Sequence, residues 1–139
     1  MKKLFILTAI ALSILIICSC KNGNRNVAEI GVDFDWQLID DGSQKNPEIR
    51  LSGVPEGITR FFVGLVDLNN NGFDHGGGFV DNDGTGVIGR GATKGHYNGP
   101  NPPFPNMIHN YEITVKAFDK KGTVIGIGRK AKKFPPQKP

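Results

Sequence analysis

Residues 111–127 read YEITVKAF-DKKG-TVIGI, and this stretch decides the fold class. Apolar and polar side chains alternate from Tyr111 to Phe118, which is the period of two of a half-buried β-strand. Residues 119–122 (DKKG) favour a turn, and residues 123–127 are again largely apolar. Two strand patterns joined by a short turn that contains glycine predict a β-hairpin.

The chain before this hairpin carries the same kind of signal. Residues 32–38 (VDFDWQL) alternate apolar and polar side chains and are followed by turn residues at 40–43. Residues 47–52 form a further strand candidate. Residues 60–68 (RFFVGLVDL) are almost continuously apolar, which predicts a central strand covered on both faces.

Glycine and proline exclude an α-helical fold. The 139 residues include 19 Gly and 9 Pro, and long helices tolerate neither residue well. We expect an all-β sandwich of six to eight strands with few or no helices. Residues 69–108 are rich in Gly and Pro and predict a long functional loop, with short β-prone pieces at 78–80 and 86–88.

The N-terminus has the pattern of a secretory signal. Lys2 and Lys3 precede an apolar run over residues 4–17, which is too short to span a bilayer comfortably. The run ends in Ile-Cys-Ser-Cys at residues 17–20, which resembles the lipobox of bacterial lipoproteins. The resemblance implies that residues 1–19 are a signal peptide and that Cys20 becomes the acylated first residue. An ordinary secreted protein cut nearby is the alternative.

A lipoprotein signal has consequences for the rest of the chain. We expect a polar tether at residues 20–28, a β domain at 29–134 and an extended tail at 135–139. The protein would sit in the cell envelope, anchored by acyl chains on the extracytoplasmic side, at the periplasm or the cell surface. No thiol would remain for a disulfide or for catalysis.

The charge balance argues against nucleic acid as a partner. Loss of Lys2 and Lys3 from 17 basic residues leaves 15 against 13 acidic residues, a formal charge of +2. The basic residues form no stripe interleaved with aromatic side chains, which nucleic-acid binding would require.

Three polar segments mark a candidate binding site in and beside the Gly-rich region. They are Asp67-Leu68-Asn69, then Asp74-His75 followed by three glycines, and then residues 97–103 (YNGPNPP) leading to His109-Asn110-Tyr111. Two histidines can donate charge-assisted hydrogen bonds, and glycines let a ligand approach backbone amides. This combination suits a small anion.

These segments resemble the phosphatidylethanolamine-binding protein (PEBP) family, also called Raf kinase inhibitor-like proteins, in its compact bacterial form. The shared pattern is an acidic motif after a strand, a loop histidine, Y-x-G-x-x-P-P and H-x-Y. The resemblance implies a small β-sandwich with a pocket for phosphate-like groups, lined by Asp67, His75, Gly99, Asn101, Pro102, Pro103, His109 and Tyr111. It also implies a small anionic ligand or phospholipid head group, or a protein partner at the same loops.

The chain departs from the family pattern at three positions near this site. Asn69 replaces the second acidic residue, Gly76 replaces the tryptophan after the loop histidine, and Asn110 replaces the arginine after the later histidine. These departures imply either a pocket with altered selectivity or a vestigial pocket.

The same residues also allow a calcium-binding interpretation, and with it a different function. Asp67, Asn69 and Asn71 fit the first half of a calcium loop, although position twelve is Gly78 instead of Glu. A cell-surface structural or calcium-stabilised interaction module without a small-molecule pocket is therefore the alternative function. The chain contains no nucleophile motif, P-loop or dinucleotide fingerprint, so we expect neither an enzyme nor a cofactor.

Overall fold

The computed structural model describes residues 26–37, 39–40, 42–70 and 72–136. The predicted signal peptide, Cys20, the first part of the tether, Leu38 and Asn71 lie outside the described residues. Within the described part there is no helix that is long and apolar enough to cross a membrane.

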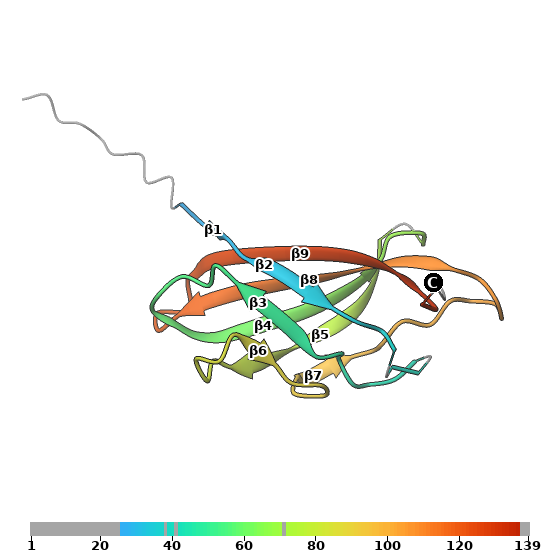
Figure 1. Ribbon diagram of the computed structural model, residues 1–139, viewed down its shortest axis with the longest axis horizontal. Coiled ribbons are helices and arrows are strands. Elements are labelled where there is room, and N and C mark those ends of the chain that lie inside the picture. The colour runs from blue at the N-terminus through green and yellow to red at the C-terminus, as the bar shows by residue number, and fades with distance from the viewer. Residues whose placement is uncertain (1–25, 38, 41, 71, 137–139) are drawn as a thin grey trace, which may run out of the picture.

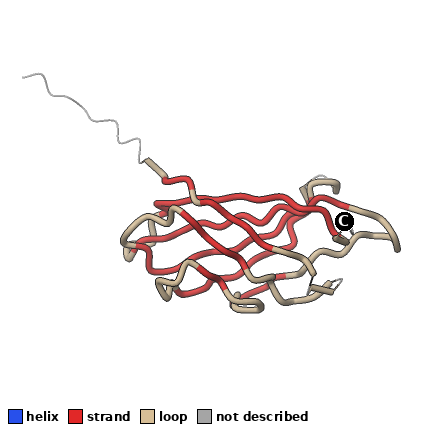
Figure 2. The backbone as a smooth tube through the Cα atoms, in the orientation of Figure 1, coloured by secondary structure: helices blue, strands red, loops and turns tan. Residues whose placement is uncertain are grey.

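The described residues form a sandwich of two sheets (Figures 1 and 2). The six-stranded sheet has the order β1-β9-β8-β4-β5-β7, and the three-stranded sheet has the order β2-β3-β6. The strands are β1 (Ala28–Glu29), β2 (Gly31–Phe34), β3 (Ile49–Ser52), β4 (Ile58–Asp67), β5 (Phe73–Asp81), β6 (Val87–Ile88), β7 (Lys94–Tyr97), β8 (His109–Asp119) and β9 (Val124–Phe134).

The hydrophobic core lies between the two sheets. Alternate residues of β4 and β8 are fully buried, among them Val63, Leu65 and Ile113. The smaller sheet contributes Phe34 and Ile49 from its own strands. This two-layer arrangement without helices among the described residues confirms the predicted all-β sandwich.

The β8–β9 hairpin is confirmed and is longer than its sequence pattern indicated. Its pairing runs from Phe118 opposite Val124 to His109 opposite Phe134. Asp119 closes the turn, because its Oδ1 accepts hydrogen bonds from the Lys121 and Thr123 amides at 2.9 and 2.8 Å. β9 therefore continues through the basic residues after 127, which the apolar pattern alone did not predict.

The strand expected over residues 32–38 ends early. β2 stops at Phe34, because the Asp35 carboxylate accepts a hydrogen bond from the Gln37 amide at 2.9 Å and turns the chain. Trp36 is nevertheless buried, at 2 % exposure. The alternation therefore identified the buried side chains of Val32, Phe34 and Trp36 correctly but overestimated the length of the strand.

The prediction of a long loop over residues 69–108 was wrong, although its short β-prone pieces at 78–80 and 86–88 overlap β5 and β6. β5, β6 and β7 all lie in this region, so the described residues form nine strands instead of six to eight. Glycine is needed there because β4, β5 and β7 approach closely: a Cβ on Gly77 would lie 2.5 Å from the Val63 carbonyl oxygen.

The expectation that residues 60–68 are covered on both faces was also wrong. In β4 the side facing the small sheet is buried, whereas Phe62, Gly64 and Val66 on the other side are only half-buried. No helix of the described residues packs on that side. The almost continuous apolar run therefore belongs to a strand with one uncovered face.

We expect Gly77→Ala to lower the free energy of unfolding by about 1–3 kcal/mol, because the new methyl group overpacks the β4–β5 contact. Gly89→Ala is the matched control, since a Cβ at Gly89 meets nothing within 4 Å. Urea denaturation of both variants measures the difference. Equal stability of the two variants would contradict the close-approach explanation for the glycines of β5.

Candidate functional site

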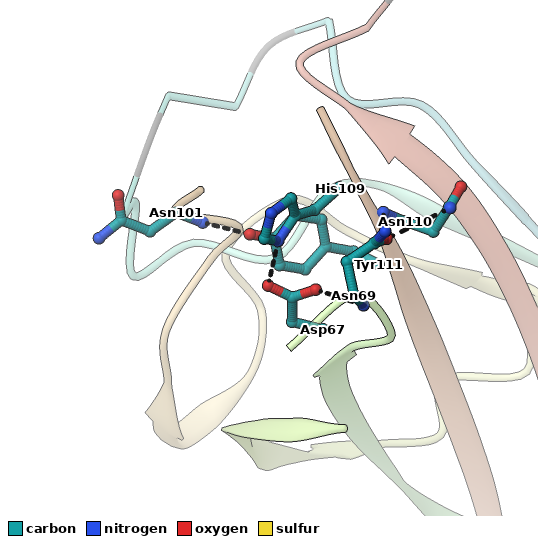
Figure 3. A network of polar contacts seen from close by, with 6 residues as sticks. All are labelled: Asp67, Asn69, Asn101, His109, Asn110 and Tyr111. Atoms are coloured by element: carbon teal, nitrogen blue, oxygen red, sulfur yellow. Dashed lines mark hydrogen bonds and ion pairs between the residues drawn. The ribbon is translucent and has the colours of Figure 1, made fainter. Parts of the chain in front are cut away.

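The site begins with a buried pair of titratable side chains. Asp67 ends β4 and His109 starts β8, and antiparallel pairing places Asp67 opposite Tyr111. The two strand ends therefore meet, with Asp67 Oδ2 2.6 Å from His109 Nδ1 (Figure 3). Asp67 is 2 % exposed and His109 7 % exposed, so water hardly screens this contact.

The environment of Asp67 favours its ionised form. Burial raises the pKa of the Asp67 carboxyl group, but hydrogen bonds from His109, the Asn69 amide and Tyr111 together outweigh it and hold the pKa below its ordinary value. The Asn69 amide donates to Oδ1 at 2.9 Å. Asp67 is therefore a fixed negative charge that orients the His109 ring, and the other ring nitrogen of His109 is left for other contacts.

Tyr111 lies at the centre of the aromatic part of the site. The His109 ring is stacked beside it, with ring centroids 6.2 Å apart. The His75 ring meets it edge-on at 5.4 Å. The Tyr111 hydroxyl accepts a hydrogen bond from the Asn101 amide at 3.2 Å. Tyr111 therefore connects both histidines with the loop after β7, although its own side chain is fully buried.

Two of the departures from the family pattern contact each other. Asn69 Oδ1 accepts hydrogen bonds from the backbone amide and the side-chain amide of Asn110, at 2.6 and 3.3 Å (Figure 3). These contacts join the loop after β4 to the start of β8. Asn69 and Asn110 thus form a neutral hydrogen-bonded pair beside the site.

A pocket of about 320 Å³ opens beside this cluster. It is lined by residues from several separate loops and strand ends: Gly42, Asp67, Asn70, Phe73, His75, Asn98, Gly99, Asn101 and Pro103. Among the described lining residues, Asp67 is the only carboxylate, and none is lysine or arginine. The donors available to a ligand are therefore the His75 ring, the asparagine side-chain amides and backbone amides.

Most of the predicted site residues gather at this pocket. Asp67, His75, Gly99, Asn101 and Pro103 line it. His109 and Tyr111 lie directly behind them, in contact with Asp67 and His75. Pro102 belongs to the same loop but is not part of the lining.

The wall formed by residues 99–101 is held by a loop that the sequence patterns did not connect to the site. Gly99 donates to the Ser43 carbonyl at 2.7 Å, and Gly42 donates to the Pro100 carbonyl at 2.8 Å. A Cβ on Gly99 would lie 2.5 Å from the Ser43 oxygen, so this close approach requires glycine. Gly42 was missed because it is far from the site in sequence and belongs to an ordinary turn.

Asn70, Phe73 and Asn98 were also missed. Asn70 and Asn98 lie inside motifs that were already recognised, so their position was the available signal. Phe73 gave no such signal. It is 56 % exposed, and its ring meets His75 edge-on at 5.1 Å. Phe73 thus provides an aromatic wall of the pocket next to His75.

The loops around the pocket expose apolar side chains. Leu68 follows β4, and three further residues lie in the loop between β7 and β8: Phe104, Met107 and Ile108. Their exposed fractions range from 42 to 66 %. The described residues of these two loops, 68–70 with 72 and 98–108, include no charged side chain. The described parts of these two loops are therefore uncharged and partly apolar.

The calcium hypothesis involves residues that already have partners. Asp67 contacts His109 and the Asn69 amide, and the Asn69 side chain contacts Asn110, whereas Asn71 lies outside the described residues. Within the described ranges no group of three or more His, Cys, Asp or Glu side chains gathers in one place.

The architecture is that of PEBP structures, as the sequence resemblance predicted. The chain is similar to Escherichia coli YbcL, described as a member of the mammalian PEBP family, with a TM-score of 0.58 and 16 % identity over 79 % of this chain and 100 % of that one. It is also similar to the putative PEBP homolog CT736 of Chlamydia trachomatis, with a TM-score of 0.52 and 14 % identity over 80 % and 99 % of the two chains. At these identities the similarity establishes the fold.

No family model matches the sequence, and no curated protein matches it.

Proposed function

We propose that this protein is a PEBP-type binding protein that holds a small anionic group, such as a phosphate-like head group, in the pocket beside Asp67 and His75. The observation that carries the proposal is the buried Asp67–His109 pair beside the His75 and Tyr111 rings, at the mouth of a PEBP-like sandwich. Asp67 orients His109, and His75 lines the pocket as a donor to the bound anion.

The surroundings of the pocket indicate what the anion is attached to. Phe73 and the exposed apolar residues of the two neighbouring loops provide a surface for an uncharged or apolar remainder of the ligand. Because none of the described lining residues is lysine or arginine, we expect low affinity for an isolated phosphate ion, and contacts with that remainder would add to it. A phospholipid, whose glycerol and acyl chains are attached to the phosphate, or a protein segment that carries an anionic group, has this chemistry.

The location of the protein belongs to the same proposal. Acylation of Cys20 would anchor it in the cell envelope on the extracytoplasmic side. β1, where the described chain begins, lies at the end of the sandwich opposite the loop 98–108 (Figure 1). An anchored domain would therefore present its pocket away from its own point of attachment. Mass spectrometry of the mature N-terminus tests this, since Cys20→Ala must abolish any acyl adduct.

The binding function is tested by following the histidine ring signals by NMR while phosphoethanolamine is added. We expect saturable shifts at His75 and His109 and none at His96, which is exposed on β7. His75→Ala should weaken binding at least tenfold, a loss of about 1.4 kcal/mol. His96→Ala is the matched control. Unchanged affinity in His75→Ala would remove the pocket assignment.

A further inference from the structure

Three asparagines of the pocket have side chains that the fold does not use. Asn70, Asn98 and Asn101 all line the pocket, and all three are exposed. Their side-chain amides make no hydrogen bond within the described part of the chain. By contrast, the side chains of Asn46 and Asn69 each bind residues that are distant in the sequence. The three lining carboxamides are therefore available to a ligand.

Backbone hydrogen bonds fix the positions of two of these asparagines. The Asn70 carbonyl oxygen accepts a hydrogen bond from the Phe73 amide at 2.9 Å, in the turn between β4 and β5. The Asn98 amide donates to the His75 carbonyl oxygen at 2.9 Å, just after β7. The backbone of both residues is thus held beside the aromatic residues of the pocket, while their carboxamides stay free of partners among the described residues.

The carboxamide of Asn101 is directed away from the cluster behind the pocket. The Asn101 backbone amide donates to the Tyr111 hydroxyl at 3.2 Å, whereas the side chain extends to the opposite side (Figure 3). A Cβ on Gly42 would lie 3.9 Å from Asn101 Nδ2, so the carboxamide lies beside another residue of the lining. Asn101 therefore presents its side chain to the pocket and its backbone to Tyr111.

We propose that the pocket contains a subsite for a sugar ring beside the anion, so that its preferred ligand is a phosphorylated sugar. This inference rests on the proposed function and names the uncharged part of the ligand. Each carboxamide offers two N–H donors and a carbonyl acceptor. A sugar carries hydroxyl groups on most of its carbon atoms, and every hydroxyl both donates and accepts. An anion alone would use only the donors, whereas a sugar uses both.

Phe73 supplies the aromatic surface that a sugar ring needs. It is 56 % exposed although it lines the pocket, and its ring meets the His75 ring edge-on at 5.1 Å. The C–H groups on one side of a sugar ring form an apolar surface, which packs on the electron-rich face of an aromatic ring. A ring packed on Phe73 would remove aromatic surface from water and leave its hydroxyl groups free to reach the carboxamides.

The volume of the pocket limits the size of the ligand. About 320 Å³ lies at the lower end of the range for small-molecule sites, which is about 300–1,000 Å³. The pocket therefore suits one phosphate with one sugar ring, and any further part of the ligand would extend beyond the lining residues.

An acyl chain or a peptide would use the three carboxamides less well than a sugar. An acyl chain would cover them without replacing their hydrogen bonds to water, and this weakens binding. The exposed Phe104 and Met107, which would suit such a chain, do not belong to the lining. A peptide offers about one donor and one acceptor in each residue of its backbone, which is fewer than a sugar of the same size.

Titration calorimetry of the full chain tests the sugar subsite. The protein is kept in a polyoxyethylene detergent, because that detergent contains no sugar. The probes are the 1-phosphates of glucose, galactose, mannose and N-acetylglucosamine, compared with sn-glycerol 3-phosphate, O-phosphoserine and phosphoethanolamine. We expect at least one sugar phosphate to bind about tenfold or more tightly than sn-glycerol 3-phosphate, which has a phosphate and hydroxyl groups but no ring.

Two substitutions assign the subsite to its residues. Phe73→Leu keeps an apolar side chain but removes the flat ring, and Asn98→Ala removes one carboxamide. Each should lower the affinity for the best sugar phosphate, relative to that for phosphoethanolamine, by about threefold or more. Phe79→Leu and Asn26→Ala are the matched controls, since both residues are exposed outside the pocket lining, and they should leave this ratio unchanged.

The possible results separate the sugar subsite from the anion pocket. If phosphoethanolamine binds but no sugar phosphate exceeds sn-glycerol 3-phosphate, the sugar subsite is wrong and the anion pocket stands. A preference for O-phosphoserine, or an unchanged ratio in both Phe73→Leu and Asn98→Ala, would also overturn the subsite. If methyl glycosides of the same sugars bind but no phosphate ester does, the sugar subsite stands without the anion pocket. Absence of all binding would overturn both.

Discussion

Asp67→Ala is expected to lower the free energy of unfolding by about 3–5 kcal/mol, because several donors at a buried site lose their acceptor, at about 1–3 kcal/mol each. The substitution leaves His109, only 7 % exposed, without the carboxylate 2.6 Å from its Nδ1. It also removes the acceptor for the Asn69 amide. Urea denaturation measures the loss. Asp81→Ala is the control, because Asp81 is exposed and its pair with Lys94 at 3.5 Å contributes little.

The same carboxylate should make stability depend on pH in the acid range. The folded pKa of Asp67 is below its ordinary value, so its contribution is fully present above about pH 4 and is lost as pH falls through the folded pKa. Asp67→Asn removes this titration. The free energy of unfolding of the variant should therefore fall less steeply than that of wild type as the pH drops below about 4. Parallel pH profiles of the two proteins would contradict the assignment of a stabilising ionised Asp67.

Trp36→Ala should lower the free energy of unfolding by about 3–5 kcal/mol, because it opens a large cavity in the core. Trp36 is 2 % exposed and meets Phe34, Phe134 and Tyr111 edge-on at ring distances of 4.7, 5.8 and 6.5 Å. Since Tyr111 supports both histidines of the site, we also expect weaker ligand binding in the variant. Circular dichroism during urea denaturation measures the stability, because Trp36 is the only tryptophan of the chain.

Trp36→Phe is the matched variant. The buried Trp36 Nε1 has no hydrogen-bond partner among the described residues, so phenylalanine loses packing but no hydrogen bond. The loss of stability should therefore be less than half of that in Trp36→Ala. A larger loss would mean that the indole nitrogen makes a stabilising contact, such as one with a buried water molecule.

Much of the fold could be predicted from local patterns. Alternation over residues 111–118 reports which side chains of β8 face the core, and a glycine turn after it indicates the hairpin. Asp67 and His109 were recognisable as a pair of candidates because each stands at the end of a strand pattern. Such signals are local, since they depend only on the two-residue repeat of a strand and on turn chemistry.

The Gly-rich strands could not be predicted in this way. In β5 the glycines at 76–78 carry no side chain, so the sequence shows no alternation there. Their strand conformation comes from the backbones of β4 and β7 on either side, which lie so close that a Cβ would clash. An alternating pattern of side chains therefore cannot predict a strand such as β5, whose close packing requires residues without side chains.

The sequence by itself determined the β class, the hairpin and the residues from which a site could be built. The tertiary structure decided that Asp67 Oδ2 lies 2.6 Å from His109 Nδ1, that Gly42 and Ser43 hold the wall of the pocket, and that one face of the large sheet remains uncovered. The physical reason is that the order of side chains along a strand determines which face of the strand is apolar. Which element packs against that face depends on contacts between residues that are far apart in the chain.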